Sequence, residues 1–83
     1  MRKVLFSESA INSLQSLKLV NPKLVLKVFD LINDIQKNSF AGLGKPEPLK
    51  NDFKGYWSRR ITDEHRLIYR DDMIEIYSTY GHY

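Results

Sequence analysis

The sequence contains no cysteine, and that absence excludes several classes of function. Thiol catalysis, a cysteine-ligated zinc site and a disulfide framework all require cysteine side chains. Long hydrophobic runs are missing as well, since no stretch of the chain approaches the roughly 20 apolar residues that a membrane span needs. No signal peptide opens the sequence. We therefore expect a cytoplasmic protein with no membrane partner.

Length and composition predict one small globular domain. The 83 residues are near the lower limit for a core that folds without disulfides or bound metal, so we assign residues 1–83 to a single domain. Hydrophobic residues make up 42% of the chain, which is enough apolar material to bury a core. The composition is that of a globular chain rather than a disordered one.

Charge is unevenly distributed along the chain, whose net charge is +3. Residues 45–70 carry seven basic and four acidic side chains, whereas residues 71–83 carry three acidic side chains and no lysine or arginine. A basic centre favours a polyanionic partner, because contacts to phosphates release bound counterions. On charge alone, an ordinary solvated surface explains the same pattern equally well.

Helix signals dominate the first half of the sequence. After a short strand at 3–6, Ser7 is a suitable N-cap for a helix that begins near Glu8. Asn21 is a suitable cap for a second helix, and Pro22 suits its first position, where the missing N–H costs little. This helix is predicted to end near Asn38. Apolar side chains recur at helical spacing in both segments, at Ile11, Leu14, Leu17, Leu24, Val28, Leu31, Ile32 and Ile35.

A loop and three strands are predicted for the second half. The glycines and prolines of residues 39–48 favour a loop there. Strands at 56–61, 65–70 and 73–79, separated by short polar turns, form an antiparallel meander. The predicted fold class is therefore α+β, with the element order β-α-α-β-β-β and two N-terminal helices packed on a small, mainly antiparallel sheet.

Alternation along these strands sorts their side chains onto two faces. Arg59 shares a face with Trp57 and Ile61, whereas Arg60 points to the other face. On the next strand, Arg66 and Leu67 point to opposite faces. If the helices cover one face, the other presents arginines beside aromatic neighbours. Arginine can bind phosphate through a fork of N–H groups and can stack on bases. Such a face suits single-stranded RNA, whose bases are unstacked.

Four stretches of the sequence carry a resemblance to a known family: Phe40–Lys50, Gly55–Ile61, Glu64–Tyr69 and the terminal His82–Tyr83. In residue types and spacing they resemble the YoeB (Txe) toxins of the RelE-like superfamily of bacterial toxin–antitoxin systems. The resemblance implies a RelE-like microbial RNase fold and a ribosome-dependent endoribonuclease, an mRNA interferase that cuts mRNA in the A site and so inhibits translation. It also implies a YefM-type antitoxin as partner, with DNA contacted only through the antitoxin complex. The sequence leaves open whether the protein forms a homodimer.

The resemblance also assigns roles to individual residues. The general base of the family falls on Glu47, the general acid on His82 and the arginine that stabilises the transition state on Arg66. Tyr83 matches a terminal tyrosine that helps to position the substrate. Basic positions of the family that neutralise phosphate fall on Lys50 and Arg60, and we expect the neighbouring Arg59 to bind RNA phosphate as well. The chain departs from its relatives mainly at Tyr80–Gly81.

Cleavage of RNA without a metal or other cofactor is consistent with these residue types. A carboxylate, with an unperturbed pKa of about 4.3, can take the proton of the attacking 2′-hydroxyl. A permanently charged guanidinium suits the negative charge that builds on the phosphate oxygens. An imidazole, with an unperturbed pKa of about 6.5, can give a proton to the departing 5′-oxygen near neutral pH.

Each of these residues also has an ordinary structural explanation. A glutamate between two prolines is usually a solvated loop residue, and a penultimate histidine usually belongs to a frayed tail. We expect His65 to be structural. Two other functions compete with the nuclease: a non-catalytic relative with the same RelE/ParE-like fold that acts by binding a protein, and a nucleic-acid-binding module that uses the basic sheet.

Overall fold

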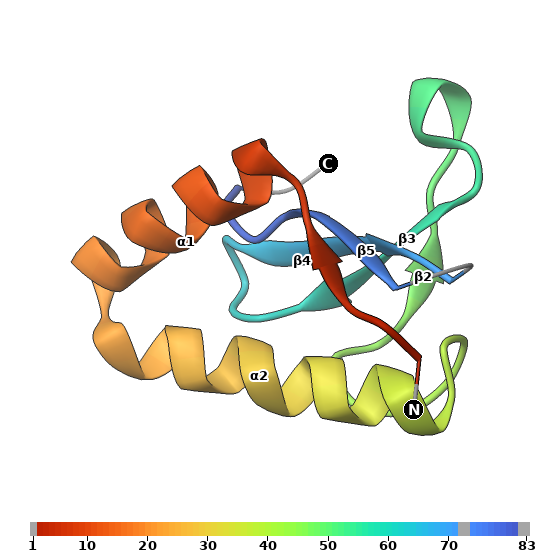
Figure 1. The fold of residues 1–83 in the computed structure, drawn as a ribbon, viewed down its shortest axis with the longest axis horizontal. Coiled ribbons are helices and arrows are strands. Elements are labelled where there is room, and N and C mark those ends of the chain that lie inside the picture. Colours follow the sequence, from red (N-terminus) through yellow and green to blue (C-terminus); the bar gives the residue numbers. More distant parts are fainter. Residues whose placement is uncertain (1, 72–73, 82–83) are drawn as a thin grey trace.

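Two helices cover one face of a five-stranded sheet in the computed structural model, which describes residues 2–71 and 74–81 (Figure 1). The helices are consecutive and the sheet draws strands from both ends of the chain. The elements are β1 Leu5–Phe6, α1 Glu8–Val20, α2 Pro22–Lys37, β2 Glu47–Pro48, the 3-10 turn η1 Asn51–Phe53, β3 Tyr56–Arg60, β4 Arg66–Arg70 and β5 Glu75–Ser78.

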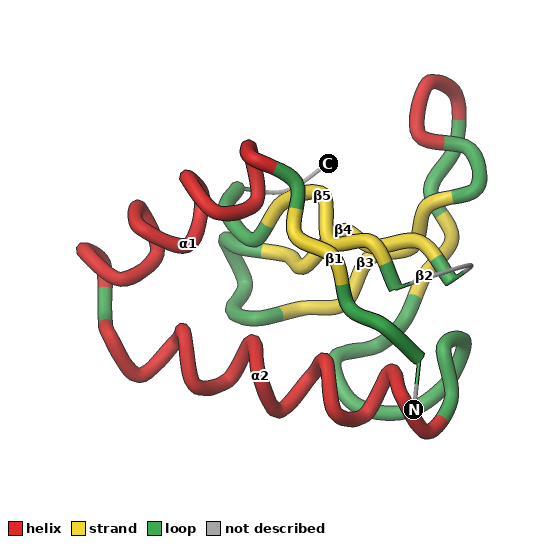
Figure 2. The backbone as a smooth tube through the Cα atoms, in the orientation of Figure 1, coloured by secondary structure: helices red, strands yellow, loops and turns green. Residues whose placement is uncertain are grey.

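The strand order in the sheet is β1-β5-β4-β3-β2, so the N-terminal strand lies beside the C-terminal one (Figure 2). β1 pairs with β5 in parallel, and the three other pairs are antiparallel. This arrangement confirms the predicted α+β class and the mainly antiparallel sheet. Neither helix in the described part of the chain has the length and apolar character of a segment that crosses a bilayer.

Both helices begin at the predicted caps. The Ser7 side chain accepts a hydrogen bond from the Ala10 N–H at the start of α1. The Asn21 side chain accepts one from the Lys23 N–H, and Pro22 occupies the first turn of α2. Each cap satisfies a backbone donor that has no partner inside the helix. Local sequence therefore determines where the helices start.

The core lies between the helices and the inner face of the sheet. It contains Ala10, Leu17, Val28, Leu31, Ile32, Ile35, Ile61, Leu67, Tyr69, Ile74 and Ile76. Ile11, which we expected among them, is 51% exposed. α1 packs through Ala10, Leu14 and Leu17, and one residue further along the helix rotates Ile11 by roughly 100° away from that stripe.

The predicted loop at 39–48 contains a short strand that the sequence did not indicate. β2 places Glu47 opposite Ser58 and Pro48 opposite Trp57. Proline lacks a backbone donor and is confined to sheet edges, which is where β2 lies. A strand of two residues, one of them a proline, carries no strand periodicity, so this element could not be read from the sequence. Glu47 is consequently fixed on a strand.

Gly44 sets the direction in which the chain enters β2. Its φ is +78°, and an added Cβ would lie 3.0 Å from the Arg60 carbonyl oxygen. The Gly44 carbonyl accepts a hydrogen bond of 2.6 Å from the Arg60 N–H. Glycine is required here because an L side chain would meet both a left-handed backbone and the neighbouring strand.

Candidate active site

The register of the sheet brings Glu47 and Arg66 together on the face away from the helices, which we call the open face. Glu47 pairs with Ser58, and Arg60 pairs with Arg66 one row further along. Leu67 belongs to the helix-side core, so its neighbour Arg66 points to the open face. Cross-strand partners share a face and alternate residues of a strand share one too, so Arg60, Ser58 and Glu47 lie on the open face as well. The Arg66 Nη1 lies 4.0 Å from a Glu47 carboxylate oxygen.

The two side chains of this pair differ in their access to solvent. The Glu47 side chain is 57% exposed, whereas that of Arg66 is 16% exposed. Arg66 also donates a hydrogen bond of 3.3 Å from Nη1 to the Ser58 hydroxyl. A guanidinium with restricted motion beside an open carboxylate can stabilise a phosphate while the carboxylate reaches a proton on the substrate.

The C-terminal segment reaches the same end of the sheet. The Arg66 N–H donates a hydrogen bond of 2.8 Å to the Gly81 carbonyl, which directly precedes His82 in the chain. His82 and Tyr83, the predicted acid and terminal tyrosine, lie outside the described residues. Their assignments therefore stay predictions, while the segment that carries them is joined to Arg66.

Lys50 and Arg60 line two different recesses, of which only the first contains Glu47. Lys50 is exposed and shares a recess of about 320 Å³ with Glu47. Arg60 is half-buried and lines another recess of about 400 Å³ together with Lys27 and Lys45. The two lysines beside Arg60 were not singled out from the sequence, because one belongs to α2 and the other to a loop.

Arg59 corrects one prediction, because its side chain is fully buried and cannot contact RNA phosphate. It points to the helix side, where Nη1 lies 2.6 Å from an Asp34 carboxylate oxygen. Its other hydrogen bonds go to the Tyr69 hydroxyl and to the carbonyls of Asn38, Ala41 and Leu43. Arg59 thus ties α2 to the loop that leads to Glu47.

The groups around Arg59 are held in defined protonation states. The Leu43 N–H and then the Arg59 guanidinium lower the pKa of the Asp34 carboxyl. Burial raises the pKa of the Tyr69 hydroxyl, which donates a hydrogen bond of 2.6 Å to the Ser39 carbonyl. An ionised Asp34 and a neutral Tyr69 give Arg59 stable partners, so the cluster is a structural support for the site.

Comparison with known proteins identifies the family. The family model that describes a YoeB-like toxin of a bacterial type II toxin–antitoxin system matches residues 6–83. The chain belongs to this YoeB family. It is 42% identical to the toxin YoeB of Mycobacterium bovis over the full length of both chains. It is 41% identical to toxin YoeB of Escherichia coli K12, covering 98% of this chain and 99% of that one.

Solved structures agree with the YoeB assignment. The YoeB/ParE toxin from Agrobacterium tumefaciens superposes with a TM-score of 0.89 at 41% identity, covering 98% of this chain and 99% of that one. A YoeB dimer from Staphylococcus aureus superposes with a TM-score of 0.87 at 39% identity, covering 99% of this chain and 98% of that one. A YoeB–YefM complex from the same organism superposes with a TM-score of 0.85 at 40% identity, covering 100% of this chain and 99% of that one.

The open face of this YoeB-family chain also carries a cluster of three aromatic rings. Ring centroids of Phe53, Tyr56 and Tyr77 lie 5.3–5.9 Å apart, and the Arg70 guanidinium carbon lies 5.4 Å from the Tyr56 ring centroid. Alternation places Tyr56 on this face. Phe53 comes from η1, within a segment without periodicity, and no sequence signal placed it there.

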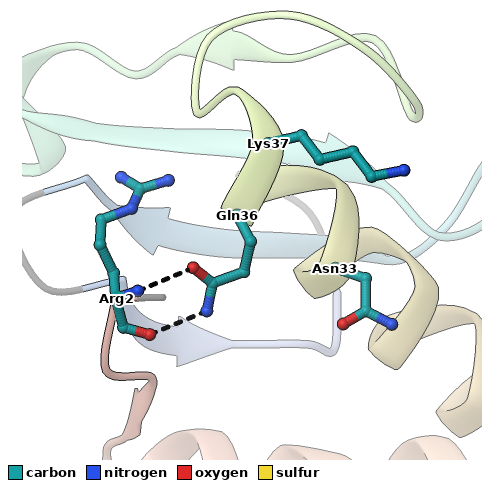
Figure 3. A pocket seen from close by; sticks show the side chains of 4 residues that line it. All are labelled: Arg2, Asn33, Gln36 and Lys37. Carbon is teal, nitrogen blue, oxygen red and sulfur yellow. Dashed lines mark hydrogen bonds between the residues drawn. The ribbon is translucent and has the colours of Figure 1, made fainter.

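A recess of about 810 Å³ lies away from these groups, between the N-terminus and α2 (Figure 3). Gln36 exchanges two hydrogen bonds with the backbone of Arg2, whose guanidinium bonds to Asp71 at 2.6 Å and to the Ile35 carbonyl. These contacts anchor Arg2 on α2 and on the turn that follows β4. We therefore assign this recess to the architecture of the YoeB-family fold and not to its chemistry.

Proposed function

We propose that this toxin is a ribosome-dependent endoribonuclease that cleaves mRNA in the A site without a metal or other cofactor. The observation that carries the proposal is the pairing of an exposed Glu47 carboxylate with the restrained Arg66 guanidinium, 4.0 Å apart on the open face. Membership of the YoeB family supports it, and so does the attachment of the C-terminal segment beside Arg66.

In the proposed reaction the Glu47 carboxylate removes the proton from a ribose 2′-hydroxyl. The freed oxygen attacks the adjacent phosphorus, and Arg66 stabilises the negative charge that develops on the non-bridging oxygens. The bond from phosphorus to the 5′-oxygen breaks, and His82 donates the proton that this leaving oxygen needs. The products are a 2′,3′-cyclic phosphate and a 5′-hydroxyl, with no net change in protons.

The remaining open-face groups fit a bound RNA strand. Lys50 lies in the recess of Glu47, where it can neutralise a phosphate next to the cleaved one. The rings of Phe53, Tyr56 and Tyr77 offer faces on which bases can stack. A ribosome-bound mRNA presents an extended single strand, which is the shape that such a face accepts.

The partners that we propose follow the family. The relatives from S. aureus form a YoeB dimer and a YoeB–YefM complex. We infer a YefM-type antitoxin as the regulator of this chain and a homodimer as its state without antitoxin. A protein of net charge +3 that cuts cellular mRNA needs such neutralisation, and an acidic antitoxin segment would supply it. Contact with DNA would occur only through that complex, in the cytoplasm.

Replacing Lys50 or Arg60 by alanine should weaken RNA binding and make it less dependent on salt. Each substitution removes one phosphate contact, so the slope of log K against log salt should become less steep by about 0.7 for single-stranded RNA. Filter binding to an oligonucleotide with a 2′-deoxy group at the cleavage position measures this. Lys18→Ala, an exposed change on α1, is the matched control. Unchanged slopes in both site variants would contradict the electrostatic assignment.

Removing His82 and Tyr83 should abolish toxicity while the fold survives. Thr79, just upstream, is held by hydrogen bonds of 2.8 Å to Ser13 on α1, so the sheet and helices keep their contacts. Growth arrest after induction and circular dichroism of the purified truncation are measured together. A folded truncation that still arrests growth would remove the terminal histidine from the mechanism.

A further inference from the structure

The last described residues of the chain are fixed at several points. The Gly81 N–H donates a hydrogen bond of 3.0 Å to His65 Nδ1, and the Gly81 carbonyl accepts one of 2.8 Å from the Arg66 N–H. The rings of His65 and Tyr80 pack with centroids 4.4 Å apart. Gly81 has a φ of +76°, which glycine adopts without strain. We call the two hydrogen bonds to Gly81 the clamp.

The clamp is built on a rigid turn between β3 and β4. The His65 carbonyl accepts hydrogen bonds from the N–H groups of Ile61 and Thr62, and the Thr62 hydroxyl accepts one from the His65 N–H. The His65 residue is only 6% exposed. The imidazole therefore has little freedom to leave its position.

The chemistry of the clamp defines the state of the imidazole. A backbone N–H can only donate, so Nδ1 of His65 must accept and carries no proton in this bond. This atom therefore has no proton to give to a substrate, in agreement with the expected structural role of His65. The contact that Nδ1 does make is with Gly81, which directly precedes His82 in the chain.

We propose that His65 is a positioning residue that orients His82 for proton donation by holding Gly81. Its place in the chain supports this. His65 precedes Arg66 and Gly81 precedes His82, so the His65–Gly81 hydrogen bond joins the immediate neighbours of the charge-stabilising arginine and the acid. It thereby ties together the two chain segments that carry these groups, which act on the same phosphate in the proposed reaction. The inference rests on the proposed nuclease function.

Two substitutions separate the hydrogen bond from mere packing. His65→Asn keeps an acceptor oxygen where Nδ1 stands, whereas His65→Gln moves the acceptor to the position of Nε2. Loss of a positioned hydrogen bond should slow cleavage by His65→Gln about tenfold, while His65→Asn stays within about threefold of wild type. Cleavage of mRNA in programmed ribosomes gives the rates, and thermal melting verifies that each variant is folded.

A second substrate shows whether the loss acts through the acid. An mRNA with sulfur in place of the bridging 5′-oxygen has a leaving group that departs without a proton. On this mRNA we expect His65→Gln to cleave as fast as wild type, as we also expect of His82→Gln. If His65→Gln matches wild type on the oxygen substrate, or is equally slow on both, the positioning role is overturned.

The wild-type control distinguishes failure of the proposed nuclease function from failure of the proposed role of His65. If wild-type protein cuts neither mRNA on the ribosome, the proposed nuclease function fails, whatever the variants do. If wild type cuts and the variants do not follow the expected pattern, only the role of His65 fails. Should His65→Gln melt below the assay temperature, His65→Phe replaces it, because the ring can still pack against Tyr80 while the acceptor is gone.

Discussion

Glu47→Gln and His82→Gln should each slow cleavage of ribosome-bound mRNA by about 10²–10⁴-fold, which is the usual contribution of a positioned acid or base. The amide of glutamine keeps the shape of the carboxylate but cannot take the 2′-hydroxyl proton. Arg66→Ala should also disable cleavage, because it removes the charge that stabilises the phosphate. Single-turnover rates on programmed ribosomes measure all three effects.

A ribosome-binding assay separates loss of catalysis from loss of affinity in these variants. Neither glutamine variant removes a phosphate-binding cation, so both should still bind the ribosome. Glu8→Gln, an exposed carboxylate change on α1, should leave the cleavage rate unchanged. Full activity in Glu47→Gln would take the carboxylate out of the mechanism and would favour a toxin that acts by binding alone.

Asp34→Ala should destabilise the fold by about 3–5 kcal/mol, because it leaves the fully buried Arg59 guanidinium without its charged partner. Domains of this size have a free energy of unfolding of roughly 4–12 kcal/mol, so much of the stability would be lost. Asp30→Ala, one turn away and exposed on the same helix, should change little. Urea unfolding of the three proteins makes the comparison.

The same pair predicts how stability depends on pH. The pKa of Asp34 is lowered in the folded state by the Leu43 N–H and by Arg59. Its stabilisation is therefore complete above the unfolded pKa of about 3.9 and is lost as the pH falls through the folded value. The gap between wild type and Asp34→Ala should shrink below about pH 4. A gap that stays constant under acid would contradict the ion pair.

Arg59 also shows where sequence reasoning succeeded and where it did not. Strand alternation correctly placed Arg59 on the face of Trp57 and Ile61, which is the face that the helices cover. Its charge suggested phosphate binding instead. The acceptors that satisfy the buried guanidinium come from α2 and from a loop without periodicity, and such contacts between distant segments cannot be read from local pattern.

Local signals explain the elements that were predicted well. The caps at Ser7 and Asn21 and the apolar spacing of α2 act over three or four residues, and the structure follows them. The strand that carries Glu47 and the bond from His65 to Gly81 depend on pairing partners 11 and 16 residues away. The residue types of the site were visible in the sequence, while their supports came only with the fold.

Primer extension on an mRNA programmed into ribosomes, with and without this protein, tests the central claim most directly. The account predicts a new cut within the A-site codon that requires both the ribosome and the protein, and that disappears with Glu47→Gln. A cut on free mRNA at the same rate, or no cut with intact ribosomes, would contradict a ribosome-dependent nuclease.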